Sequence, residues 1–103
     1  MDVAISKNNV KIRLTPERWL HITEGHPEMA GYYYEVLEAI QEPDFIYKGS
    51  YDELLAVRNI GIDIFIIVVY KETSKTNGFV ITAFISKKIN YLQNKELLWE
   101  KKK

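Results

Sequence analysis

The chain has 103 residues, of which 47% are hydrophobic, and its 14 acidic residues balance 14 basic ones. This length suits one domain with a single hydrophobic core, and the absence of cysteine excludes disulfide bonds, thiol catalysis and thiolate metal sites. Proteins that coat nucleic acid are usually strongly basic, so this neutral chain would need a local basic patch to bind one.

Nothing in the sequence indicates membrane contact. The longest apolar run, residues 64–70, is far too short to span a bilayer as a helix. The first residues lack the long apolar core of a signal peptide. We therefore expect a cytoplasmic protein.

The first predicted elements are a strand and a helix. Residues 10–14 alternate apolar and basic side chains, which is typical of a half-exposed strand. A helix is predicted over residues 16–24, because Thr15 can cap it and Pro16 suits the first helical position. Gly25 can take the left-handed conformation that ends a helix.

A second helix is predicted from residue 27 or 28 to residue 41. Its apolar residues, among them Met29, Val36 and Ile40, recur at helical spacing and indicate a buried stripe. Pro43 cannot continue this helix.

From residue 44 onward the pattern is typical of strands. The predicted strands cover residues 45–48, 53–60, 64–70 and 79–86. Residues 64–70 are β-branched and almost wholly apolar, so we expect them to form the central strand. Asn77-Gly78 favours a hairpin turn that pairs this strand antiparallel with residues 79–86.

The order of these elements predicts an α+β fold, in which two N-terminal helices pack on a twisted antiparallel sheet of four to five strands. The whole chain, residues 1–103, is interpreted as a single domain. Residues 89–103 are expected to form a short C-terminal helix or tail.

The only histidines, His21 and His26, flank the predicted end of the first helix. On an unbroken helix they would lie about 140° apart, which does not suit a metal pair on one face. If the helix ends at Gly25, both rings could flank one substrate. Alternatively, His26 could simply satisfy open carbonyls at the helix end.

Four polar residues in the predicted strands are the other candidates: Arg58, Lys71, Thr82 and Ser86. Alternation predicts that Thr82 and Ser86 lie on one face of the last strand, with Phe84 between them. If the helices pack on their face, one sheet edge would collect imidazole, cationic and hydroxyl groups. Such a set suits metal-free RNA cleavage, in which imidazoles exchange protons and cations stabilise the phosphoryl oxygens. The structural alternative for Arg58 is an ion pair with an acid such as Asp52 or Glu53.

Several short runs resemble phage and mobile-element domains of the barnase–EndoU–colicin–RelE-like (BECR) nuclease superfamily. The runs are residues 14–22, 26–28, 39–44, 69–72 and 79–84, and the resemblance extends over residues 10–88. It implies two helices on a four- or five-stranded sheet, with an RNase-like cleft.

Carried over to this sequence, the resemblance favours a full set of site residues. It implies His21 and His26 as the imidazole pair, Arg58 and Lys71 as phosphate contacts, and Thr82 and Ser86 as polar groups of the cleft.

The sequence therefore predicts a toxin-like, metal-independent endoribonuclease that cleaves RNA through the 2′-hydroxyl. His21, with Glu17 and Glu24 within reach along the helix, is the expected general base, and His26 the expected acid. No cofactor and no metal are expected. The partners are RNA and, for a toxin, a neutralising antitoxin or immunity protein.

The alternative is a non-catalytic protein-binding module that keeps the nuclease-like fold. Such a module would use aromatic side chains, Tyr32 to Tyr34 with Trp99, to contact its partner.

Overall fold

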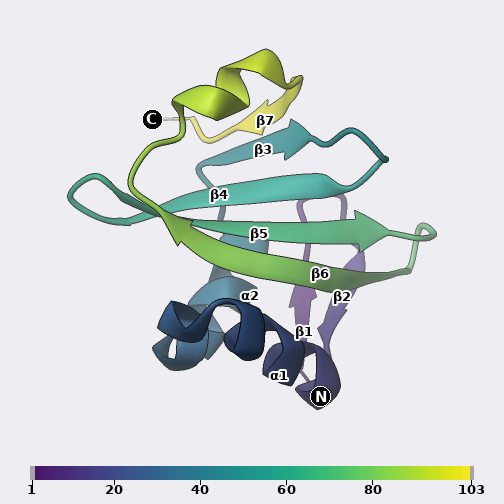
Figure 1. The fold of residues 1–103 in the computed structure, drawn as a ribbon. Helices are drawn as coiled ribbons and strands as arrows, with labels where there is room; N and C mark the ends of the chain where they lie inside the picture. Colours follow the sequence, from purple (N-terminus) through teal and green to yellow (C-terminus); the bar gives the residue numbers. More distant parts are fainter. Residues whose placement is uncertain (1, 103) are drawn as a thin grey trace.

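The computed structural model describes residues 2–102 as one sheet flanked by short helices (Figure 1). In chain order the elements are β1 (Asp2–Ile5), β2 (Lys11–Leu14), α1 (Pro16–Gly25), η1 (Pro27–Gly31), α2 (Tyr33–Gln41), β3 (Phe45–Lys48), β4 (Leu54–Gly61), β5 (Ile64–Glu72), β6 (Asn77–Ser86), η2 (Asn90–Asn94) and β7 (Leu97–Glu100), where η1 and η2 are 3-10 helices.

The sheet is larger than expected, and its pairing is mixed. Its seven strands lie in the order β1-β2-β6-β5-β4-β3-β7, with β2 parallel to β6 and the other neighbours antiparallel. The expectation of a four- to five-stranded antiparallel sheet is therefore wrong, although the α+β class holds. The two extra strands are the four-residue edges β1 and β7, which are too short and too exposed to show a clear alternation.

The two predicted strands form the central hairpin, but the predicted turn is wrong: Asn77 and Gly78 belong to β6, and residues 73–76 make the turn. β5 pairs antiparallel with β6, and Val68 lies opposite Ala83. The first helix begins as predicted, and Thr15 caps it by accepting the backbone N–H of Arg18. Its end differs from the prediction, because Gly25 is the last helical residue and does not take the left-handed conformation. The second predicted helix is divided into η1 and α2, because the chain leaves helical geometry at Tyr32.

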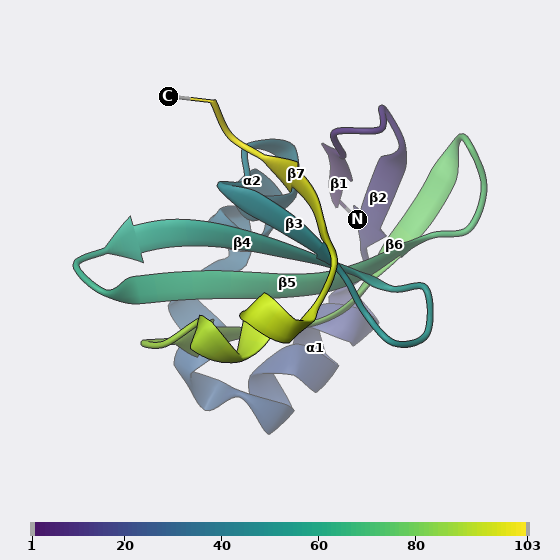
Figure 2. The ribbon, with the colours of Figure 1, turned by 90° about the horizontal axis from the view of Figure 1, so that it is seen from above.

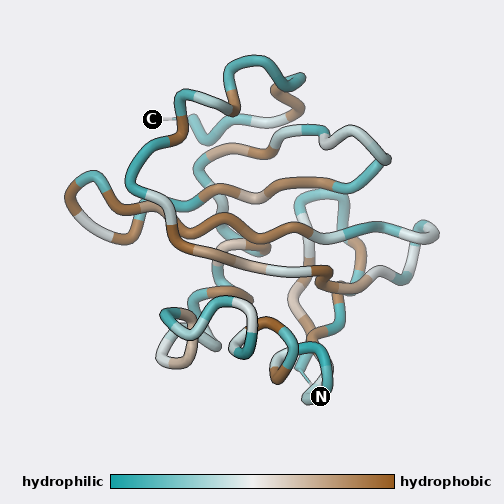
Figure 3. Tube along the Cα trace, viewed as in Figure 1, coloured by the Kyte–Doolittle hydropathy of each residue, from teal (hydrophilic) through white to brown (hydrophobic). Residues whose placement is uncertain are grey.

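Two clusters of apolar side chains cover the two faces of the sheet. On one face, Ile66 and Val68 of β5 pack with Ile22 of α1 and Ile40 of α2. On the other face, a smaller cluster joins β4 and β5 to Leu92 of η2. Figure 3 shows that the central strands are hydrophobic along most of their length, as a strand covered on both faces must be.

The C-terminal segment is neither a plain helix nor a tail. After η2, the chain forms β7, which pairs with β3 and places Trp99 beside Ile46. The ammonium group of Lys7 lies 5.1 Å from the centre of the Trp99 ring. Within residues 2–102 no helix has the length and apolar character needed to cross a membrane.

Much of β6 has a free edge. Only Asn77 to Phe79 of β6 pair with β2, and within residues 2–102 the remainder of β6 has no strand neighbour on that side. α1 and η1 lie along this edge, and η2 lies on the opposite face of the sheet (Figures 1 and 2).

Candidate functional site

A β-bulge in β6 shapes the face on which the candidate residues lie. Thr82 lies opposite Val69, but Val80 lies opposite the next residue, Tyr70, so Ile81 is an extra residue in the ladder. Strict alternation would place residues 79 and 84 on opposite faces, because they are five positions apart. The bulge brings them to the same face.

We call this face of β5 and β6, opposite the one covered by α2, the open face. It carries Lys71 from β5 and Phe79, Thr82, Phe84 and Ser86 from β6. All five side chains are partly exposed. Each points away from the main core, because the alternate residues, such as Tyr70 and Ala83, are buried in it.

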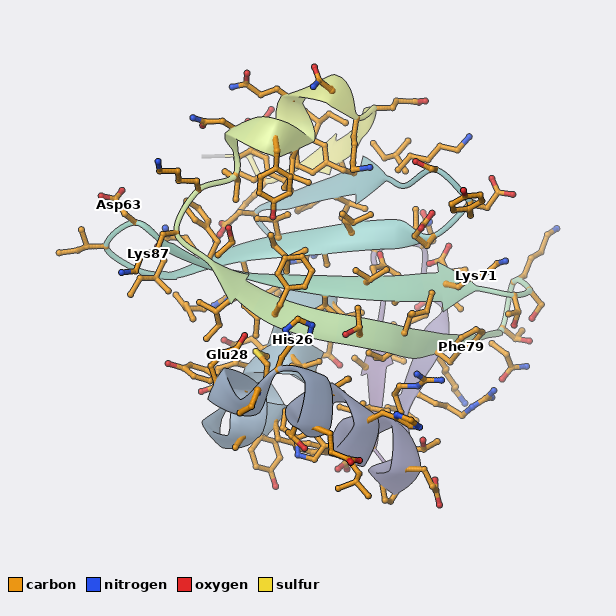
Figure 4. All side chains as sticks on the ribbon, in the orientation of Figure 1. His26, Glu28, Asp63, Lys71, Phe79 and Lys87 are labelled. Carbon is orange, nitrogen blue, oxygen red and sulfur yellow. The ribbon has the colours of Figure 1, made fainter. Side chains whose placement is uncertain are left out.

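His26 lies at the border of the open face because of how α1 ends. Its backbone N–H donates to the carbonyl of Ile22 at 2.7 Å, and its carbonyl accepts from Met29 at 2.9 Å. The backbone of His26 thus caps the end of α1, and its imidazole makes none of these hydrogen bonds. The imidazole lies 5.8 Å from the ring of Phe84, with a tilt of 32° between the planes. Figure 4 shows His26 between the helices and β6.

The His26 ring has one charged neighbour. Its Nδ1 lies 3.6 Å from Oε2 of Glu28, and the His26 side chain is 40% exposed. Neither ring nitrogen makes a hydrogen bond with the described part of the chain. An imidazole that is held in place, partly exposed and free of competing hydrogen bonds can exchange protons with a bound molecule.

Arg18 is a site residue that the sequence interpretation missed. Its guanidinium donates from Nη1 to the carbonyl of the bulged residue Ile81 at 3.3 Å. Arg18, Ile22 and His26 recur every four residues, so one side of α1 presents the arginine and delivers the histidine to the same edge of β6. That four-residue spacing is the signal in the sequence that could have identified Arg18.

His21, the predicted base, lies on the exposed surface of α1. Helical geometry places it about 60° around the axis from Arg18. Its ring makes no hydrogen bond and no ion pair with residues 2–102. The structure therefore does not join His21 to His26 through any contact, and its role as base stays a prediction.

The two hydroxyl residues lie where alternation predicts, on the open face. Thr82 is partly exposed, and its hydroxyl makes no hydrogen bond with another described residue. The Ser86 hydroxyl donates to the carbonyl of Lys88 at 2.5 Å and accepts the N–H of the same residue at 3.3 Å. Ser86 thus stabilises the turn that follows β6.

Lys71 shares the open face but not the neighbourhood of His26. It lies opposite Phe79, whereas the His26 ring contacts Phe84. Five residues of strand separate the two positions along β6, which is about 16 Å. Figure 4 shows Lys71 at the far end of the hairpin from His26.

Arg58 lies on the face of the sheet that α2 covers, opposite the face that carries Lys71, Thr82 and Ser86. Its Nε lies 3.2 Å from Oε1 of Glu38, and its Nη1 donates to the carbonyl of Glu42 at 2.5 Å. The expected collection of all cations at one edge fails because α2 packs on the face opposite the hydroxyl residues. Arg58 does pair with an acid, but with one on α2 instead of Asp52 or Glu53.

The open face is only partly covered: Phe84 packs against the smaller apolar cluster that includes Leu92 of η2, whereas Lys71, Phe79 and Thr82 stay partly exposed. A pocket of about 420 Å³ lies at another corner, lined by residues of β3, β4, β5 and the C-terminal strand, and it includes none of the predicted site residues. Among residues 2–102, no three His, Asp or Glu side chains are grouped so that they could hold a metal ion.

No known protein family, no curated protein and no solved structure matches this chain.

Proposed function

We propose that the protein is an endoribonuclease that cleaves RNA by general acid–base catalysis at the border of the open face. The single observation that carries the proposal is the placement of the His26 imidazole against Phe84, partly exposed and with no competing hydrogen bond. An open surface suits a polymer better than a small molecule, which usually binds in a concave site.

The reaction needs two proton transfers and charge stabilisation. The 2′-hydroxyl attacks the adjacent phosphorus, the bond to the 5′-oxygen breaks, and a 2′,3′-cyclic phosphate and a free 5′-hydroxyl result. One group takes the proton of the 2′-hydroxyl, and another gives a proton to the leaving 5′-oxygen.

His26 is suited to the acid step, because Glu28 can hold Nδ1 and leave Nε2 directed to the substrate. His21 is retained as the base. Arg18 takes over the phosphate contact once predicted for Arg58: its guanidinium has five donors, and one of them binds the Ile81 carbonyl.

The test is to incubate purified protein with mixed RNA in excess chelator and to analyse the product ends. We expect cyclic phosphate ends, and His26→Ala should lower the rate by roughly 10²- to 10⁴-fold. His21→Ala is the matched variant on the same helix, and an equal loss there supports the two-imidazole mechanism. The proposal is wrong if the chelator abolishes cleavage, if DNA is cut equally, or if RNA stays intact.

A second candidate, a protein-binding module, is favoured by one aromatic surface. The ring of Tyr33 makes edge contacts with Trp19 at 5.1 Å and with Tyr34 at 5.2 Å, and Tyr34 is 74% exposed. Trp99 packs against Lys7, and within residues 2–102 its ring makes no aromatic contact with this group. Intact RNA, together with a complex in cells that Tyr34→Ala abolishes, would favour this function.

A further inference from the structure

We propose that three neighbouring side chains on the open face form a binding site for single-stranded RNA. Arg13 of β2 lies beside Phe79 of β6, and Phe79 lies opposite Lys71 of β5. We call Arg13, Phe79 and Lys71 the basic–aromatic row. The proposal rests on the proposed function for the identity of the polymer.

The three side chains of the row point to the same side of the sheet. The adjacent residues Ile12, Val80 and Tyr70 are buried in the main core on the other face. Because successive side chains of a strand alternate, the row must point away from that core. The bulge at Ile81 makes this possible, since without it Phe79 would turn inward.

The two cations of the row are available for a ligand. Arg13 donates from Nη1 to the side-chain oxygen of Asn77 at 3.2 Å, which fixes the guanidinium and leaves other donors free. Lys71 has no carboxylate within ion-pair distance among residues 2–102. The Glu53 carboxylate accepts the backbone N–H of Tyr51 at 2.7 Å, which is the main cause of its lowered pKa, and the charge of Lys71 adds only a smaller part.

The chemistry of the row fits an unpaired nucleotide. A nucleobase stacks on an aromatic ring, and the phosphates on either side of it pair with cations, which is how proteins bind single strands. Bases in a duplex are stacked on one another, so their faces cannot reach Phe79. The row therefore selects single-stranded RNA over double-stranded RNA.

The row continues into the candidate active site. Phe79, Thr82 and Phe84 follow one another on the open face of β6, and the His26 ring contacts the last of them. A strand of RNA that runs along β6 would cover about 16 Å between the two phenylalanines. The row would thus hold nucleotides displaced from the bond that is cut.

The experiment measures binding without cleavage. The probe is a fluorescent 2′-O-methyl oligouridine of ten nucleotides, which cannot be cut through its 2′-oxygen, and the readout is fluorescence anisotropy with the full chain. Phe79→Leu keeps the apolar volume but loses the ring, and we expect binding about 5- to 150-fold weaker. Phe79→Trp should retain binding.

The two cations are tested by the salt dependence. Arg13→Gln and Lys71→Gln should each reduce the slope of log K against log salt by about 0.7, the value for one phosphate contact on a single strand. Lys48→Gln, an exposed lysine at the end of β3, is the matched control and should leave the slope unchanged.

The inference is overturned if the native chain does not bind the probe, if it binds an RNA duplex as tightly, or if all three row variants bind within about twofold of the native chain. Its failure is distinct from failure of the nuclease proposal. RNA cleavage with normal kinetics in the row variants would discard only the row, whereas row-dependent binding without any cleavage would discard only the nuclease.

Discussion

At the scale of single residues, the buried hydroxyl of Tyr70 in β5 is an unfavourable feature of the core. Tyr70 is fully buried in the main core, and its hydroxyl has no hydrogen-bond partner among residues 2–102. A buried polar group without a partner costs about 1–3 kcal/mol. We therefore expect Tyr70→Phe to raise the free energy of unfolding by about 1 kcal/mol, measured by urea denaturation.

Tyr33→Phe is the matched control for this change. The Tyr33 hydroxyl donates to Oδ2 of Asp2 at 2.5 Å, so its removal should be neutral or slightly destabilising. A loss of stability in Tyr70→Phe larger than that in Tyr33→Phe would mean that the Tyr70 hydroxyl has a partner in solution.

Single residues also show what sequence reasoning can and cannot locate. Thr82 and Ser86 were placed on the same face correctly, because alternation within a strand is a local property. Arg58 was misplaced because alternation does not say which face the helices cover. Arg18 was overlooked because its four-residue spacing to His26 shows only a shared helix side, and its partner, a backbone carbonyl 63 residues away, is fixed by tertiary packing.

At the scale of elements, the start of α1 supports the candidate site. The Thr15 hydroxyl accepts the backbone N–H of Arg18 at 3.1 Å, and the Arg18 guanidinium then reaches the bulge in β6. Thr15→Ala should cost about 0.5–2 kcal/mol of unfolding free energy, the range for losing a helix cap. Chemical denaturation monitored by circular dichroism measures the loss.

Thr23→Ala provides a comparison within the same helix. The Thr23 hydroxyl bonds back to the carbonyls of Trp19 and Leu20, a mid-helix contact that adds little stability. If Thr23→Ala were as damaging as Thr15→Ala, the cap would not be the source of the effect.

The elements that escaped prediction share a physical cause. The bulge at Ile81 sits in an apolar run where neither face has a distinct polarity, so an extra residue leaves no mark in the sequence. β1 and β7 gain their stability by pairing with β2 and β3 and not from their own pattern. The pairing of β5 with β6 was predictable from their β-branched and apolar composition, but the position of the turn was not, because Asn77 and Gly78 are strand residues of β6.

At the scale of the whole molecule, the connection between the two halves of the sheet is the feature that the sequence did not specify. β2 pairs with β6 in parallel register although more than sixty residues separate them in the sequence, and the helices and β3 to β5 lie in that intervening chain. Such a non-local pairing depends on how the complete core packs, and local propensities do not encode it. The α+β class was accessible, but the mixed seven-stranded topology was not.

The same core determines how stability should depend on pH in the alkaline range. Burial, followed by the hydrogen bond to Asp2, raises the pKa of Tyr33 from 10.0 to about 12. Burial also raises the pKa of Tyr70 and, with a smaller part from Glu100, that of Tyr47. In each case the folded chain holds its phenolic proton at a pH where the unfolded chain has released it.

The sign of the effect follows from this difference in bound protons. Below pH 10 both states hold the protons, so the contribution of these tyrosines is fully present. Between pH 10 and about 12 the unfolded state binds fewer protons than the folded state, and stability falls as pH rises. We expect the urea midpoint to decrease steadily over this interval, and the double variant Tyr33→Phe with Tyr70→Phe to decrease less. Equal decreases in the native and double-variant chains would assign the alkaline transition to groups other than these two phenols.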